Sequence, residues 1–247
     1  MESDKIRINK FLSMSGICSR READRAILEG RVLVNSLPSE QGQMVSEDDE
    51  ILFDGKRVSL NNEDIYLIFN KPMGLVCTTA KFENGVKIRN VVDYINYPER
   101  IYPVGRLDKN SEGLLILTNQ GNVMNKVLKS RYNHEKEYFV KVNKDISDED
   151  LKRLSKGVRI FDPSKNREVY TKRCKVWRES LDSFHIILTQ GLNRQIRRMC
   201  EAFGFKVVRL RRDRIVNITL GELKPGKYRK LSKEEVAELK RQLNIDE

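Results

Sequence analysis

The sequence is poor in the residues that most metal sites and proton relays require. It has two histidines, His134 and His185, among 247 residues, which argues against a histidine triad or a metal cage. His185 lies inside the apolar run 184–188 and is typical of a satisfied strand residue. Its four cysteines form no CxxC pair, so we expect reduced thiols rather than a zinc ribbon or a redox dithiol. No GxGxxG segment follows a predicted strand, so the sequence shows no Rossmann-type binding site for a dinucleotide. We expect a reaction without metal or cofactor.

Long apolar runs are also missing. None approaches the roughly 18 residues that a membrane-spanning helix needs. The first ten residues are charged where a signal peptide would be apolar, so we expect a cytoplasmic protein without membrane association. The sequence shows no exposed apolar heptad or stripe on which a partner chain could pack, and we therefore expect a monomer.

Positive charge, by contrast, is abundant. The chain has 47 Lys and Arg against 36 Asp and Glu, which gives a net charge of +11 and a pI near 9.5. A balance of this kind favours polyanionic partners, and nucleic acid leads the candidates. The hydrophobic content of 39% is enough for one large domain or two unequal ones.

Residues 5–58 are predicted to form a small α/β unit with a pair of helices and short strands at 32–34, 51–53 and 56–58. The second helix should begin at Ser19, because Glu22 three residues later completes a capping box, and should end near Gly30. Seven basic residues and three acidic ones lie between positions 5 and 31, so one face is basic; it is either a solvated surface or a phosphate-binding one. We place the domain boundary after residue 60. It divides an N-terminal domain of residues 1–60 from a second domain of residues 61–247.

After this unit the pattern changes to repeated strands with intervening helices. Strands are not regularly followed by helices of crossover length, which favours an α+β domain with a large mixed or antiparallel sheet flanked by helices. The predicted strands are residues 65–70, 75–79, 101–104, 114–118, 137–142, 169–176 and 184–190. The predicted helices are residues 123–128, 148–156, 194–203 and 233–243, the second capped by Ser147 and the last by Ser232.

A first candidate site residue is Asp108, which lies on the loop between two of these strands. A loop aspartate is often only a turn former. Here Arg106 and Lys109 bracket it with positive charge, as a carboxylate nucleophile requires. No second carboxylate is at hand, which argues against the paired-acid mechanism of glycosidases.

A second candidate is the basic helix predicted at 194–203. Asn193 can cap it, and Arg194 and Arg198 should face away from the core. Arg197 falls at the margin of the apolar stripe, where it can reach a carboxylate or form a structural salt bridge. Residues 192–214 hold eight basic side chains and two acidic ones, a density that favours a surface for phosphates.

A third candidate is Tyr138, whose strand alternation places it on the same face as Val140 and Val142. An inward tyrosine can simply be a core residue. In a basic cleft, an aromatic ring can also stack on an extruded base.

These segments carry a family resemblance. Residues 8–12, 16–23 and 30–32 resemble the small α-L RNA-binding motif of a ribosomal protein and several RNA-modifying enzymes. Almost the whole chain resembles the RsuA/RluB/RluE/RluF family of ribosomal RNA pseudouridine synthases. It is most similar to the RluF branch, which acts on large-subunit RNA. Residues 161–168 are longer and more polar than in that branch. The family motifs are Asn70-Lys71-Pro72-Met73-Gly74, Gly105-Arg106-Leu107-Asp108, Lys136-Glu137-Tyr138 and Asn193-Arg194-Gln195-Ile196-Arg197-Arg198-Met199.

The resemblance implies a cofactor-free isomerisation of uridine to pseudouridine in 23S ribosomal RNA or a large-subunit assembly intermediate. It implies Asp108 as nucleophile, Tyr138 as the residue that stacks on the base, and Arg197 as the basic partner of Asp108. Arg106 is expected to help hold the duplex open. Open alternatives are the same chemistry on another ribosomal site or on transfer RNA, and a non-enzymatic RNA-binding or ribosome-assembly factor. The expected RNA-binding residues are Lys10, Arg20, Arg21, Arg106, Leu107, Lys109, Leu192, Asn193, Arg194, Gln195, Arg209, Arg211 and Arg212.

Overall fold

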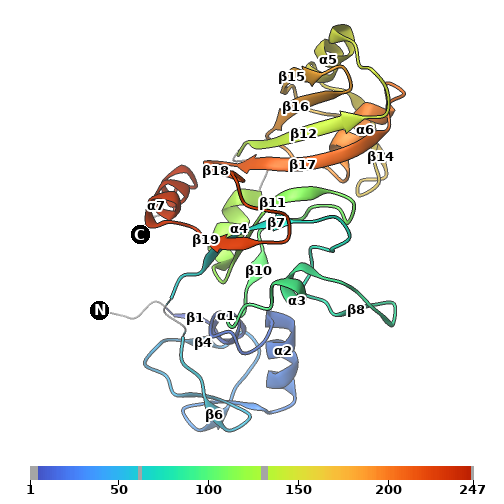
Figure 1. Ribbon diagram of the computed structural model, residues 1–247. Coiled ribbons are helices and arrows are strands. Elements are labelled where there is room, and N and C mark those ends of the chain that lie inside the picture. Colours follow the sequence, from blue (N-terminus) through green and yellow to red (C-terminus); the bar gives the residue numbers. More distant parts are fainter. Residues whose placement is uncertain (1–4, 61–62, 129–132, 246–247) are drawn as a thin grey trace. The chain divides into compact units, whose positions relative to one another are not determined.

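The computed structural model describes residues 5–60, 63–128 and 133–245, and the chain divides into two compact units (Figure 1). Unit 1 comprises Met1–Asp64 and Tyr97–Ile101, and unit 2 comprises Ile65–Asn96 and Tyr102–Glu247. Each unit has its own hydrophobic core.

Unit 1 contains the predicted helical pair, α1 (Ile8–Met14) and α2 (Arg20–Leu28). The capping box at the start of α2 is confirmed, because the hydroxyl of Ser19 accepts the amide of Glu22 while the Glu22 carboxylate accepts the amide of Ser19. The buried face of the pair packs on a four-stranded sheet in the order β3-β2-β5-β6. The strands of this unit are β1 (Ile6–Arg7), β2 (Val32–Val34), β3 (Leu37–Pro38), β4 (Met44–Val45), β5 (Ile51–Phe53) and β6 (Lys56–Arg57).

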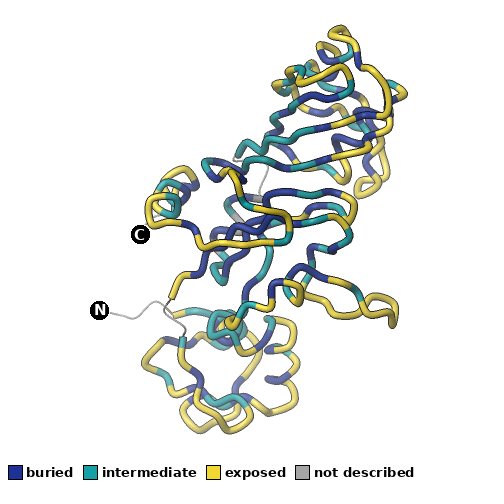
Figure 2. Tube along the Cα trace, in the orientation of Figure 1, coloured by how far each residue is buried: buried dark blue, intermediate teal, exposed yellow. Residues whose placement is uncertain are grey.

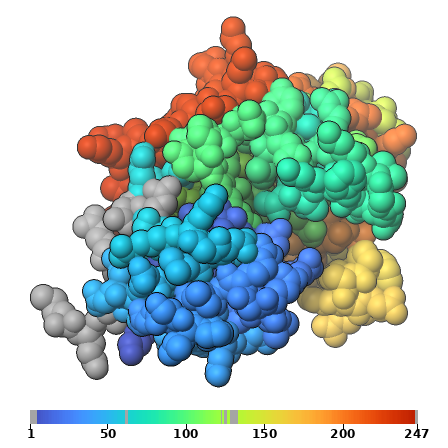
Figure 3. Space-filling view, turned by 90° about the horizontal axis from the view of Figure 1, so that it is seen from below, coloured from blue at the N-terminus to red at the C-terminus, as the bar shows by residue number. Residues whose placement is uncertain are grey.

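The outer side of α2 carries the expected positive charge. Arg20, Arg21 and Arg25 are exposed, and Lys10 on α1 is half-buried. Arg31, just beyond α2, is instead bound to carboxylates, with Nη2 2.5 Å from Asp54. Residues 5–60 of this unit form one continuous surface, coloured blue to cyan in Figure 3.

Unit 2 is built on a nine-stranded mixed sheet, so the predicted α+β class is confirmed. Its main path runs β15-β16-β12-β17-β11-β7-β19, with β10 beside β11 and β18 beside β17. The β11–β17 pair is parallel, and the other pairs of this sheet are antiparallel. The strands are β7 (Tyr66–Lys71), β10 (Tyr102–Pro103), β11 (Glu112–Thr118), β12 (Lys136–Val142), β15 (Lys175–Ser180), β16 (Ser183–Leu188), β17 (Val207–Ile215), β18 (Ile218–Thr219) and β19 (Tyr228–Lys230).

Helices cover the sheet in two places and create two apolar cores. On the β12, β16 and β17 part lie α5 (Asp148–Ser155) and α6 (Gln195–Glu201), which bury side chains such as Leu151 and Met199. On the β7 and β11 part lie α4 (Gly121–Leu128) and α7 (Lys233–Gln242), which bury Val123 and Leu239. Figure 2 shows β7 and β11 mostly dark blue, in agreement with their near-continuous apolar sequences.

Two strand predictions are wrong. Residues 75–79 form no strand and make a single isolated bridge between Val76 and Asn90, because Gly74 at φ 90° turns the chain after β7. Residues 169–176 are split, since the buried Thr171 uses its hydroxyl to accept the amide of Val158. The chain there forms a separate hairpin of β13 (Arg159–Asp162) and β14 (Arg167–Tyr170) before it enters β15.

Short elements that the sequence did not reveal lie between β7 and β10. They are the hairpin of β8 (Phe82–Glu83) and β9 (Val86–Lys87), and the five-residue helix α3 (Val91–Ile95), which is capped by the side chain of Asn90. Their brevity explains why no periodic pattern announced them.

Candidate active site

Asp108 lies on the loop that joins β10 to β11, as predicted from the sequence. Its Oδ2 is 3.6 Å from Nη1 of Arg194 and 3.8 Å from Nε of Arg197, both from the start of α6. One third of its side chain is exposed, at 33%. The loop therefore presents a single, accessible carboxylate to two guanidinium groups.

Arg197 is fixed by the backbone rather than by the carboxylate. Its Nη1 donates to the carbonyl of Val207 at 2.9 Å, and its Nη2 donates to the carbonyl of Asn110 at 2.8 Å. Its Nε is buried, has no hydrogen-bond partner, and faces Asp108. Burial, followed by the charge of Arg194, lowers the pKa of Arg197. The margin position predicted for Arg197 thus became a nearly buried one that reaches toward a carboxylate.

Lys71, at the end of β7, holds the same loop from the other side. The residue is fully buried, and its Nζ donates to the carbonyls of Ser111 at 2.7 Å and Pro72 at 3.0 Å, with that of Lys109 at 3.5 Å. Burial lowers its pKa. Sequence reasoning did not single out Lys71, although it belongs to the first family motif.

Two further contacts fix the segment around Asp108. The amide of Gly74 donates to the carbonyl of Lys109 at 2.8 Å, and the amide of Leu107 donates to Sγ of Cys77 at 3.3 Å. Burial raises the pKa of the Cys77 thiol, so this sulfur stays protonated and acts as an acceptor. A lone cysteine carries no such signal in the sequence, and it was missed.

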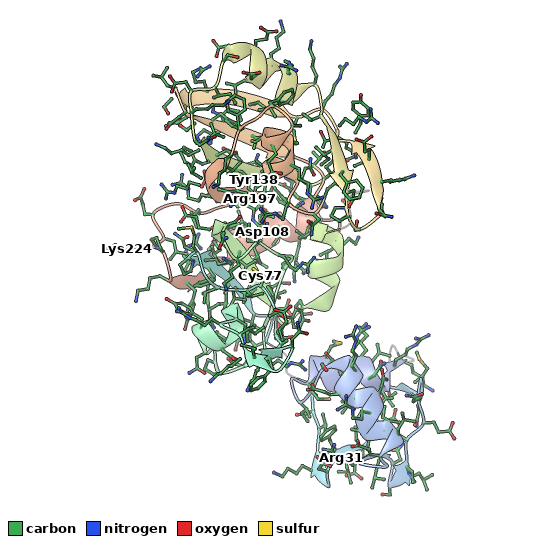
Figure 4. The ribbon with its side chains drawn as sticks, turned by 90° about the vertical axis from the view of Figure 1, so that its right-hand side faces the viewer. Arg31, Cys77, Asp108, Tyr138, Arg197 and Lys224 are labelled. Atoms are coloured by element: carbon green, nitrogen blue, oxygen red, sulfur yellow. The ribbon has the colours of Figure 1, made fainter. Side chains whose placement is uncertain are left out.

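Tyr138 lies on β12, directly opposite Arg212 of β17 and Ile186 of β16. On the far side of β17, Gly113 at the start of β11 is the register partner of Arg212. The loop of Asp108 leads straight into β11, so the register brings the carboxylate and the tyrosine to the same part of the sheet. Figure 4 shows Asp108, Arg197 and Tyr138 in this region. Tyr138 is half-buried against the core.

The other residues near Asp108 that were predicted to bind RNA differ in their exposure to solvent. Arg106, Lys109, Asn193 and Arg194 are exposed, while Leu107 is buried. Arg106 and Lys109 are close to the Asp108 carboxylate in sequence, and Arg194 is close to it in space.

The start of α6 differs from the prediction that Asn193 caps it. The cap position is Arg194, in the left-handed region at φ 50°, and no side chain caps the helix. Gln195 closes the turn instead, because its Oε1 accepts the amide of Leu192 at 3.1 Å. Asn193 accepts a hydrogen bond from Nη2 of Arg198 at 3.1 Å.

The basic strand β17 does not form one basic face. Arg212 is buried on the side of the helices, with Nε bonded to the carbonyl of Leu114 at 2.8 Å. Arg209 and Arg211 alternate to the other side, where they pair with Glu112 and Asp213, each at 2.5 Å. The structure thus does not bring Arg209 and Arg211 to the side of the sheet that holds Arg212.

A polar groove of ≈ 530 Å³ follows these outer arginines and the loop from Thr219 to Pro225. Its arginines are already paired with carboxylates, and Asp108 does not line it.

Within the described residues, no three His, Cys, Asp or Glu side chains come together as metal ligands. In the same part of the chain, no helix has the length and apolar character needed to cross a membrane.

Two family models match the chain. The model described as RNA pseudouridylate synthase matches residues 65–202, and the model of the S4 domain matches residues 6–51.

The chain is also similar to individual proteins. It is 44% identical over 241 residues to the dual-specificity RNA pseudouridine synthase RluF of Escherichia coli K12, covering 97% of this chain and 80% of the relative. It is 35% identical to the ribosomal large subunit pseudouridine synthase B of Bacillus subtilis, with 95% of each chain covered. A solved pseudouridylate synthase matches with a TM-score of 0.67 and 26% identity, covering 95% of this chain and 99% of the other.

Proposed function

The chain belongs to the RNA pseudouridylate synthase family, and we propose that it isomerises a uridine of large-subunit ribosomal RNA with Asp108 as the nucleophile. It is an RNA pseudouridine synthase, an isomerase with an S4 domain before the catalytic domain. The observation that carries the proposal is the lone carboxylate of Asp108, one third exposed and facing two guanidinium groups.

The reaction suits a single carboxylate. The bond from ribose C1′ to base N1 breaks, the uracil turns, and C1′ joins C5, so no atoms are gained or lost. Asp108 either attacks the sugar or assists elimination of the base, and each route starts from its charged oxygen. Arg197, anchored to two carbonyls, orients that oxygen.

The target nucleotide must leave its stack before Asp108 can reach the sugar, at a cost of a few kcal/mol. Tyr138 supplies the aromatic surface that receives the base. Arg106, exposed and two residues before Asp108, helps to hold the duplex open. Turnover on folded RNA should therefore fall when Arg106 is replaced by alanine.

Large-subunit RNA is the favoured substrate because a relative that covers 95% of this chain is named a ribosomal large subunit synthase. Another relative is named dual-specificity, which favours testing a second RNA class, and transfer RNA is our second candidate. The S4 domain, with Lys10, Arg20 and Arg21, provides the phosphate contacts.

The test is the substitution Asp108→Asn, with exposed loop residue Asp145 changed to Asn as the matched control. Both variants and the natural chain are incubated with large-subunit RNA, small-subunit RNA and transfer RNA, and pseudouridine is mapped by mass spectrometry. We expect Asp108→Asn to bind large-subunit RNA and form no product, while Asp145→Asn keeps full activity. A chain that binds RNA but forms no pseudouridine on any of the three would be an assembly factor.

A further inference from the structure

The catalytic unit buries more positive charge around Asp108 than one carboxylate can balance. Lys71, Arg212 and Arg197 are exposed by only 0%, 3% and 8%, and Lys71 lies within electrostatic reach of both Arg212 and Asp108. The nearby Glu112 is bound to Arg209 at 2.5 Å. Burying unpaired cations costs several kcal/mol, so their presence indicates that the site receives a further negative charge during its work.

Arg212 is the least satisfied of these cations. Its Nε donates to the carbonyl of Leu114 at 2.8 Å, but its Nη2 is buried with no hydrogen-bond partner. Among the described residues it forms no ion pair with a carboxylate. Its positive charge therefore acts on the side chains that lie beside it on the same face of the sheet.

The group beside it is Lys136, at the start of β12. Its amine donates only to the carbonyl of His134, at 3.3 Å, and in the described part of the chain no carboxylate lies within ion-pair distance. Burial, followed by the positive charge of Arg212, lowers the pKa of Lys136 to about 8. Lys136 is only half-buried, so its amine keeps hydrogens for a ligand.

Strand geometry places Lys136 next to the proposed base-stacking residue. Lys136 and Tyr138 are two residues apart on β12 and share one face, about 6.6 Å apart along the strand. Arg212 is the cross-strand partner of Tyr138. Their strands, β17 and β12, lie side by side in Figure 1. A uracil stacked on Tyr138 would have an edge within reach of the long, flexible side chain of Lys136.

We propose that Lys136 stabilises the negative charge of the uracil ring after the bond to ribose has broken. When the C1′–N1 bond breaks, its electron pair remains on the ring and spreads over N1, O2 and O4. The ammonium of Lys136 donates hydrogen bonds to a ring carbonyl at this stage. After C5 has joined C1′, the C5 proton leaves, N1 gains a proton, and the ring is neutral again; Lys136 keeps its own proton throughout. The inference rests on the proposed function and applies to either role of Asp108.

The experiment compares Lys136→Met, Lys136→Arg and the control Lys141→Met. Lys141 is an exposed lysine of the same strand, paired with Asp182. Single-turnover rates are measured on two RNAs that differ only in having uridine or 5-fluorouridine at the target. Fluorine stabilises the anionic ring by itself, so it should substitute for part of the lysine's contribution.

We expect Lys136→Met to slow cleavage of the uridine bond about 100-fold, the scale of losing one preorganised donor to a developing oxyanion. On the 5-fluorouridine RNA, Lys136→Met should slow cleavage by only about 10-fold or less. Its affinity for both RNAs should be unchanged. Lys136→Arg should recover most of the rate, and Lys141→Met should match the natural chain.

The pH profile gives an independent readout. The charged or titratable groups facing Lys136 are Arg212 from β17 and His134, which precedes β12 by two residues, while its register partners Leu188 and Ile215 are apolar. Because the protonated amine is the active form, the natural rate should fall as pH rises through about 8. In Lys136→Arg this fall should be absent.

Equal losses on uridine and 5-fluorouridine would show a structural role and overturn the inference alone, as would an unchanged rate in Lys136→Met. Absence of pseudouridine from the natural chain on every RNA overturns the proposed function and the inference with it. Thermal unfolding of each variant separates lost folding from lost chemistry.

Discussion

Arg197 approaches Asp108 with the one nitrogen that the backbone leaves free. Its Nε is 3.8 Å from Oδ2 of Asp108, while Nη1 and Nη2 bind the carbonyls of Val207 and Asn110. One guanidinium thus links the start of β17, the loop of Asp108 and helix α6. Only a planar group with several donors in fixed directions can make these contacts together.

Replacing Arg197 with lysine should therefore disrupt the site although the charge is kept. A lysine cannot donate to both carbonyls and still face Asp108, so one buried carbonyl loses a charged donor worth about 1.5–3 kcal/mol. We expect turnover to fall at least about 100-fold, together with a lower melting temperature. Arg198→Lys, one position along on the same helix, is the control and should stay within about three-fold of the natural rate; equal rates for the two variants would contradict this account.

Gly113 should tolerate no side chain. It has φ +100°, and an added Cβ would lie 2.7 Å from the backbone nitrogen of Arg212, with the Arg212 carbonyl still closer. This is the point where parallel strands β11 and β17 meet, so the backbone cannot give way cheaply. We expect Gly113→Ala to lower the free energy of unfolding by about 3 kcal/mol, measured in urea. Gly191→Ala, where the added Cβ meets nothing within 4 Å, should change it little.

The exposed arginines of α2 should contribute more to RNA affinity than the paired arginines of β17. We expect the double variant Arg20→Gln and Arg21→Gln to bind RNA more weakly and to reduce the slope of log affinity against log salt by about 1.4–1.8, for two lost phosphate contacts. Arg209→Gln should change the slope less, because Arg209 is already bound to Glu112. Filter binding across a salt series measures the RNA affinity and its salt slope for each variant. Equal changes in slope per substituted arginine would contradict this prediction.

Local features of the fold followed from the sequence because their causes are local. Ser19 and Ser232 each form a capping box with the glutamate three residues later, and the helices begin where the capping pattern predicts. Strands β11 and β12 follow from an apolar run and from alternation, which need no knowledge of their partners. The family motifs likewise identify the loop of Asp108 from the sequence alone.

Tertiary structure decided what the charges and polar groups actually contact. The sequence shows a dense run of arginines from 209 to 214, but only the register and pleat of β17 turn Arg212 inward while Arg209 pairs with Glu112 outside. The full burial of Lys71 and the bond from Leu107 to Cys77 depend on segments about 30 to 40 positions apart in the chain. Composition sets how much charge a chain carries, whereas packing across a sheet sets which charges lose water and which carbonyls they must satisfy.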